Sequence, residues 1–195
     1  MRHCGTQLLQ TGRLVLRRFT IDDSEMMFGN WAGDPEVTRY LRWNAHRSWA
    51  ETAEYLNLVA QQYPNPEFYD WGIEVRATGV LIGSISIGKG QLDTGWPRAC
   101  DRLGLPWEVG YCLGRKWWNQ GYATEALCAV RDFWFGTAKG QWLTCCHAFE
   151  NVASAAVMQK AGFTYHHDAV HRRFDGTEVP VRVYFLLRNQ VELPR

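Results

Sequence analysis

The sequence predicts a mixed α/β fold, in which a central, mostly antiparallel sheet carries helices on both faces. Segments with the two-residue alternation of strands are interspersed with segments of helical period along the 195 residues. A strand–helix–strand unit over 107–148 requires two parallel strands joined by a right-handed crossover. Turn formers at 77–79 and 175–176 indicate hairpins. Because 46% of the residues are hydrophobic, the chain can bury a full core, and we expect one domain over residues 1–195.

The first half of the chain combines a strand, helical segments and a hairpin. Residues 13–20 alternate as a strand, with Leu14 and Leu16 on one face. Helix starts are then indicated at three places, namely Asp22, Asp34-Pro35 and the capping box of Ser48 and Glu51. The last of these helices is expected to turn Trp49 and Leu56 towards the core. Strands at 68–75 and 80–87 follow as the first hairpin.

The second half is organised around residues 107–126. Trp107–Leu113 is rich in β-formers and bounded by Pro106 and Gly114, which predicts a buried strand. Apolar residues then recur at helical spacing until Gly136. A strand at 142–148, a helix at 151–162 and strands at 162–170 and 179–187 complete the chain.

Composition argues against several classes of partner. The net charge is only +1, from 21 basic and 20 acidic side chains, so electrostatics gives no case for nucleic acid or an acidic membrane. No secretory signal or membrane-length apolar run is found, and we expect a cytoplasmic protein. The six cysteines lack paired CxxC spacing and are expected to be reduced thiols, with no metal bound.

The turn between the predicted strand and helix has the character of an anion site. Residues 114–124 contain no acidic side chain, whereas Arg115 and Lys116 supply positive charge. A glycine-containing turn before a helix presents several unpaired backbone N–H groups to one point, which favours a phosphate. Neither GxxxxGK[ST] nor GxGxxG occurs in the chain.

This turn resembles the pyrophosphate loop of the GNAT N-acetyltransferases. The family pattern is Gln or Arg, two variable residues of which the first is often Gly, then Gly, one variable residue, and Gly or Ala. Here it reads Trp118-Asn119-Gln120-Gly121-Tyr122-Ala123, with Trp118 and Asn119 departing from it. A second family signature, Asn151 to Ser154 and Lys160 to Phe163, starts 30 residues after Gly121. Together with Glu108-Val109-Gly110-Tyr111, these motifs are similar to the branch of ribosomal-protein N-terminal acetyltransferases.

The resemblance covers nearly the whole chain and implies the GNAT fold. Its two parallel strands would splay apart and leave a slot for the pantetheine arm of acetyl-CoA, the co-substrate. The pyrophosphate would lie against the main chain at the helix start, and pantetheine against the splayed strand and the second signature. The coenzyme contacts implied in this way are Tyr111, Cys112, Leu113, Trp118, Asn119, Gln120, Gly121, Tyr122, Ala123, Thr124, Asn151, Ser154 and Lys160.

Glu108 is the candidate general base. It lies in mid-strand among Trp107, Val109 and Tyr111, where desolvation would raise the pKa of its carboxyl, and one bridging water would suffice to reach an amine. The alternative is a salt-bridged strand carboxylate without a catalytic role.

Ser154 is the candidate partner of the leaving thiolate, one turn into its helix. The alternative is a small residue that allows close approach of the coenzyme. Many GNAT proteins have a tyrosine four residues later that protonates the thiolate; here that position is Met158. The role therefore falls to Ser154, to water or to another tyrosine such as Tyr122.

The predicted activity is acetyl transfer to a primary amine by direct attack in a ternary complex. The acceptor is a protein N-terminus or a small-molecule amine, and the connection at 88–106 is expected to help shape its site. His166, His167 and His171 are expected on a surface or acceptor site rather than on a metal. Two alternatives stay open, an acyl-CoA-binding sensor without turnover and a purely structural or interaction domain in which the tryptophans form a protein interface. A homodimer stays open as well.

Overall fold

The computed structural model describes residues 1–90, 96, 104, 106–191 and 193. Its centre is an eight-stranded sheet in the order β1-β2-β3-β4-β5-β6-β8-β7. All neighbouring strands are antiparallel except β5 and β6, which run parallel. The predicted mixed sheet with one parallel pair is therefore confirmed.

The strand bounds follow the apolar runs of the sequence closely in the middle of the chain. The strands are β1 (Leu9–Gln10), β2 (Leu14–Arg17), β3 (Tyr69–Val75), β4 (Val80–Lys89), β5 (Trp107–Leu113), β6 (Trp142–Ala148), β7 (Thr164–Arg172) and β8 (Glu178–Leu187). The prediction for residues 13–20 was too long. Arg17 binds Asp23 and Glu74 through its guanidinium, and Thr20 already precedes the helical turn Ile21–Asp23, so the strand ends at Arg17.

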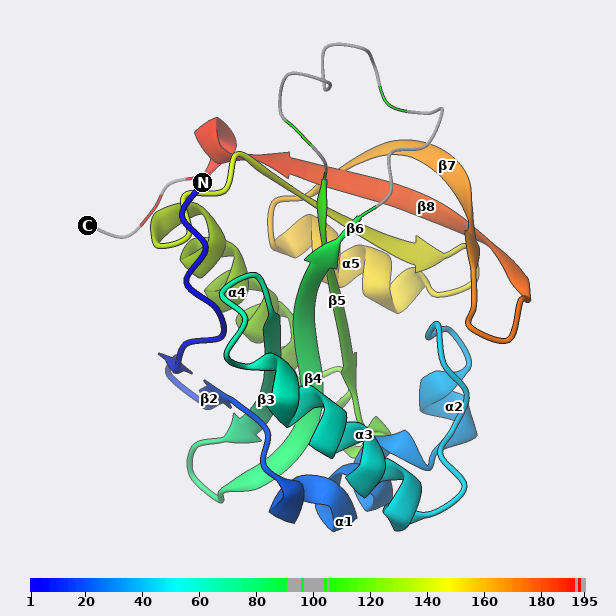
Figure 1. The fold of residues 1–195 in the computed structure, drawn as a ribbon. Coiled ribbons are helices and arrows are strands. Elements are labelled where there is room, and N and C mark those ends of the chain that lie inside the picture. The colour runs from blue at the N-terminus through cyan, green and yellow to red at the C-terminus, as the bar shows by residue number, and fades with distance from the viewer. Residues whose placement is uncertain (91–95, 97–103, 105, 192, 194–195) are drawn as a thin grey trace.

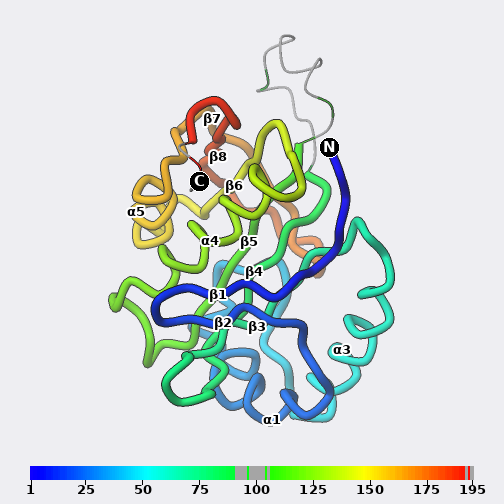
Figure 2. The backbone as a smooth tube through the Cα atoms, turned by 90° about the vertical axis from the view of Figure 1, so that its left-hand side faces the viewer, coloured from blue at the N-terminus to red at the C-terminus, as the bar shows by residue number. Residues whose placement is uncertain are grey.

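Helices cover both faces of the sheet. The α-helices are α1 (Ser24–Met27), α2 (Pro35–Thr38), α3 (Trp49–Gln62), α4 (Tyr122–Gly136) and α5 (Val152–Lys160). Figure 2 shows α3 on one side of the sheet and α4 and α5 on the other. The α4/α5 side holds the larger apolar cluster, which includes Leu127, Trp134 and Met158, and the α1/α3 side holds a smaller one around Trp31 and Leu56.

Helix α3 faces the core with a different stripe from the predicted one. Ser48 Oγ accepts from the N–H of Glu51, as the capping box predicts. Trp49, however, is 55% exposed, whereas Thr52, Leu56 and Val59 are buried. The aromatic ring at the first helical position therefore lies outside the core.

Most of the connection at 88–106 lies outside the described residues. The prediction that this connection helps shape the acceptor site therefore concerns residues outside the described part of the chain. Within the part of the chain that is described, no helix is both long and apolar enough to cross a membrane.

Candidate active site

The two parallel strands separate after a single paired position. Glu108 of β5 pairs with Thr144 of β6, and the Thr144 hydroxyl donates to the Trp107 carbonyl at 3.2 Å. Beyond this point β6 pairs only with β8, and Figure 1 shows it leaving β5 at an angle. Within the described chain, Val109–Leu113 therefore has no strand partner on its β6 side. The expected splayed pair is confirmed.

The turn after β5 bends sharply into α4. Asn119 and Gly121 have positive φ angles, 59° and 80°, so both adopt the left-handed conformation that asparagine and glycine tolerate best. Gly121 is the N-cap residue and offers no side chain to the first helical N–H groups. Among the described residues, none accepts a hydrogen bond from the N–H groups of residues 122–124. These groups are therefore available to a ligand.

Residues of the connection between β1 and β2 brace the turn before α4. Arg13 Nε contacts Glu125 Oε2 at 2.7 Å, and Arg13 Nη1 donates to the Gln120 carbonyl at 3.0 Å. The Thr11 hydroxyl donates to the other oxygen of Glu125 at 2.6 Å. The Arg13 guanidinium also lies 4.4 Å from the ring centre of Tyr122. The orientation of the helix start thus depends on residues more than 100 positions earlier.

A groove of about 510 Å³, called the main groove below, runs from this turn to the start of α5. Of the predicted coenzyme contacts, those on its wall are Tyr111, Cys112, Leu113, Trp118, Asn119, Gly121, Tyr122, Ala123, Thr124, Asn151, Ser154 and Lys160. Gln120 is not on the wall, because its side-chain amide turns back to the Lys116 carbonyl. The structure adds wall residues that sequence reasoning missed, among them Trp117, Val157, Val37 of α2 and Tyr40 just after it.

A smaller cavity of about 140 Å³ adjoins the main groove, and we call it the small cavity. Glu108, Gly110, Cys146, His171 and Arg42 are on its wall. It shares five residues with the main groove, namely Tyr40, Leu41, Tyr111, Asn151 and Ser154. The two spaces therefore meet where β5 and β6 diverge.

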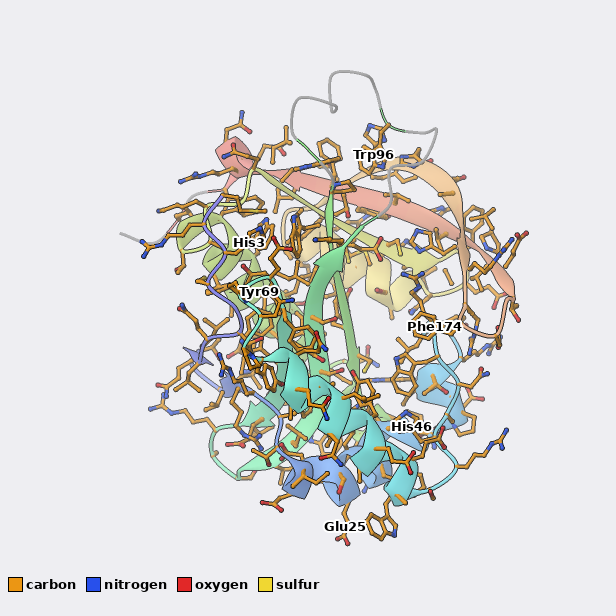
Figure 3. All side chains as sticks on the ribbon, in the orientation of Figure 1. His3, Glu25, His46, Tyr69, Trp96 and Phe174 are labelled. Carbon is orange, nitrogen blue, oxygen red and sulfur yellow. The ribbon has the colours of Figure 1, made fainter. Side chains whose placement is uncertain are left out.

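The wall of the small cavity opposite β5 is built by the β7–β8 turn and the segment after α2. Arg173 donates to the carbonyls of Arg39 and Trp43, at 2.8 and 3.2 Å. The backbone N–H of Phe174 donates to the Arg42 carbonyl at 2.8 Å. Figure 3 shows Phe174 at this turn, above α2. Arg42 stacks over its ring and forms no ion pair among the described residues.

At the junction, a tyrosine and a serine form a pair. The Tyr111 hydroxyl lies 2.8 Å from Ser154 Oγ and 3.1 Å from the Ser154 carbonyl oxygen. Burial raises the pKa of Tyr111 well above its ordinary value, so the phenol stays protonated. Asn151 Oδ1 accepts from the Ser154 N–H as the α5 cap. Its side chain therefore offers the main groove chiefly a donor.

Glu108 is the second residue of β5, nearer the start of the strand than the predicted mid-strand place, and it lies on the wall of the small cavity. Its side chain is 24% exposed, and burial raises the pKa of its carboxyl, with His171 and Arg42 opposing the rise. The nearest basic group is His171, whose Nε2 lies 3.9 Å from Glu108 Oε2. The carboxyl is thus half-buried, close to a base and in contact with the small cavity.

Comparison with known proteins decides the family. The model of the acetyltransferase (GNAT) domain matches residues 13–164. The chain belongs to the GNAT family. An uncharacterized N-acetyltransferase of Bacillus subtilis (strain 168), YoaA, is 29% identical over 184 residues, which are 93% of this chain and 97% of that protein.

Solved GNAT-fold structures superpose on almost the whole chain. A candidate ribosomal-protein-serine acetyltransferase from Vibrio cholerae has a TM-score of 0.77 at 23% identity, over 94% of this chain and 99% of the other. The ribosomal L7/L12 alpha-N-protein acetyltransferase RimL, solved with coenzyme A, has a TM-score of 0.73 at 15% identity, over 93% and 98%. At these identities the likeness concerns the fold.

Two further residues of this GNAT protein bear on the candidate chemistry. Met158 is 1% exposed and packs in the core below α5, so this position does not face the main groove. The Cys112 thiol lies 3.3 Å from Ser84 Oγ, and burial raises its pKa to about 11. At neutral pH it is a thiol, which is a poor nucleophile.

Proposed function

We propose that this protein is an acetyl-CoA-dependent N-acetyltransferase that transfers the acetyl group to a primary amine by direct attack. The observation that carries the proposal is the meeting of the two spaces at Tyr111 and Ser154, with a helix start at one end and Glu108 at the other. Acetyl-CoA would supply the thioester, and a protein N-terminus or small-molecule amine would be the acceptor.

The main groove suits the coenzyme in charge and shape. The free N–H groups of residues 122–124 would hold the pyrophosphate at the positive end of the α4 dipole. The unpaired edge of Val109–Leu113 would hydrogen-bond to pantetheine, and an N–H on this edge would polarise the thioester carbonyl. Asn151 would donate to the same arm, and Lys160 supplies a positive charge on the groove wall.

The small cavity suits an amine. Its volume of about 140 Å³ admits the amine-bearing end of an acceptor rather than a folded domain. Glu108 would take the proton from the amine, directly or through one water, because its raised pKa makes it a stronger base than an ordinary carboxylate. The neutral amine would then attack the thioester carbon, and the carbon–sulfur bond would break.

The leaving thiolate would be stabilised by Ser154. The single hydroxyl proton of Tyr111 can go to the Ser154 carbonyl at 3.1 Å or to Ser154 Oγ at 2.8 Å; in the second arrangement the serine hydroxyl is free to donate towards the sulfur. Tyr111 itself is a poor proton source, since its pKa lies far above that of a thiol, about 8.5. We therefore assign Tyr111 the orientation of Ser154, and not the transfer of a proton.

The test combines binding and turnover. Thr124 is the third residue of α4 and lies on the wall of the main groove, where Thr124→Glu adds a charge without helix strain. Two unit charges about 8 Å apart at an effective dielectric of about 20 repel by about 2 kcal/mol, so calorimetry should show acetyl-CoA binding at least tenfold weaker. Thr124→Gln is the neutral control and should bind within about twofold of the wild type.

Glu108→Gln should keep acetyl-CoA affinity and lower acetylation of a panel of amines and N-terminal peptides by about 10²-fold or more. Binding that Thr124→Glu leaves unchanged would mean that the phosphates do not lie at α4. Binding without transfer to any acceptor, and without an effect of Glu108→Gln, would instead support the acyl-CoA sensor.

A further inference from the structure

Three metal-ligating side chains converge on the small cavity. Glu108 comes from β5, Cys146 from β6 and His171 from β7, and each contributes one ligand atom to a group whose members lie within 4.8 Å of one another. Cys146 Sγ lies 3.4 Å from His171 Nδ1, and His171 Nε2 lies 3.9 Å from Glu108 Oε2. Among the described residues, no second group of this kind is found.

The spacing and the chemistry of this trio match one class of ion. Zinc bonds of about 2.0–2.3 Å in a tetrahedron separate neighbouring ligand atoms by roughly 3.5 Å. The two distances above involve opposite nitrogens of His171, only one of which can bind the ion, so the three ligand atoms, which lie within 4.8 Å of one another, close on one ion by rotation of the side chains towards it. A thiolate, an imidazole and a carboxylate suit Zn²⁺, whereas Mg²⁺ and Ca²⁺ prefer oxygen ligands alone. With three protein ligands, a fourth position would open onto the small cavity.

We propose that Glu108, Cys146 and His171 form a zinc-binding site in the small cavity. Zn²⁺ would bind the cysteine as a thiolate, so that the Cys146 proton is released to solvent on binding. The Arg42 guanidinium faces the same cavity and opposes a second cation there, so the affinity would be moderate rather than that of a structural zinc.

The site has a consequence that rests on the proposed function. A carboxylate bound to zinc cannot accept a proton from an amine, and the ion would fill the space assigned to the acceptor. Zinc would therefore inhibit transfer while acetyl-CoA still binds, because no residue of the trio is on the wall of the main groove.

The experiment titrates Zn²⁺ and Co²⁺ into the full chain under reducing conditions. We expect one Zn²⁺ per chain by calorimetry, and a near-ultraviolet thiolate-to-cobalt charge-transfer band with Co²⁺. Cys146→Ser should abolish the band, and Cys146→Ser and His171→Asn should each weaken zinc binding by about tenfold or more. Cys128→Ser removes a half-buried thiol outside the trio and should change neither readout.

A wild-type protein that binds no zinc, or that binds Co²⁺ without the thiolate band, would overturn the site even if the variants did not fold. Zinc binding that Cys146→Ser leaves unchanged would do the same. Zinc binding is measured without an acceptor and therefore does not depend on acetyl transfer. If the protein binds zinc but acetylates no acceptor, the proposed function is overturned and the metal site is not.

Discussion

Gly121 offers a quantitative test of the helix start. Its φ of 80° places it in the left-handed region, where an L-residue costs about 1–2 kcal/mol. An added Cβ would meet Arg13 Nη2 at 3.3 Å, but a guanidinium at the end of a flexible side chain can move by that little. The cost of Gly121→Ala is therefore mainly that of the backbone, about 1–2 kcal/mol.

Gly136 at the other end of α4 is the matched control. Its φ is not positive, and an added Cβ would meet nothing closer than Leu193 Cδ2 at 3.9 Å. Gly136→Ala should therefore stabilise the helix by about 0.5–1 kcal/mol. Because the two effects have opposite signs, the free energies of unfolding of Gly121→Ala and Gly136→Ala, measured by urea denaturation, should differ by about 2 kcal/mol.

Coenzyme binding supplies the second readout for this pair. If Gly121→Ala relaxes its strain by leaving the left-handed region, the N–H groups of residues 122–124 turn away from one another. Acetyl-CoA affinity should then fall by about tenfold, the equivalent of about 1.4 kcal/mol, while Gly136→Ala keeps the wild-type affinity. Equal stability and equal affinity of the two variants would refute the assignment of this turn.

Three further predictions concern the sheet. Burial raises the pKa of Asp70 from 3.8 to about 7. The protonated carboxyl therefore makes its full contribution to the stability of the folded state below pH 3.8, and this contribution is lost as the pH rises through 7. Asp70→Asn should thus raise the free energy of unfolding by up to about 4 kcal/mol at pH 8 and little at pH 4, as measured in urea. Gly110→Ala meets no atom within 4 Å and adds a methyl to the small cavity, so the acceptor KM should rise while calorimetry shows unchanged acetyl-CoA affinity. Tyr111→Phe should lower kcat about tenfold, the loss of one hydrogen bond to Ser154, with acetyl-CoA affinity within about twofold in the same assays.

Local patterns predicted the central elements well. The strand at 107–113 and the strand at 142–148 have the bounds that their apolar runs indicate, and Asn151 caps α5 as predicted. In each case the deciding residues are neighbours in sequence, such as Pro106 and Gly114 around β5. The turn at Asn119–Gly121 is also decided by residues that are neighbours in sequence, because asparagine and glycine adopt the left-handed conformation more easily than other residues.

Contacts between distant residues could not be predicted in this way. Arg13 and Glu125 are 112 positions apart, and no local spacing relates them. Cys146 and His171 come together only because β7 folds back along β8, which the sequence indicates as a hairpin without fixing which side chains meet. Likewise Met158 has the expected place in α5 but lies in the core, because the rotation of a short helix depends on what packs against it.

The single parallel bridge explains why the groove and the acid lie together. Glu108 occupies the last position at which β5 pairs with β6, so its side chain lies at the point of divergence while the next backbone groups are free. Were the pairing to extend by two residues, it would use the edge that is proposed to hold pantetheine. Gly110 lies two residues further along β5 and carries no side chain, which leaves the small cavity open beside the acid. Thus, under the proposed function, the same break in the ladder would expose a backbone edge for the coenzyme and leave room for an amine at Glu108, so that an extension of the pairing would remove both.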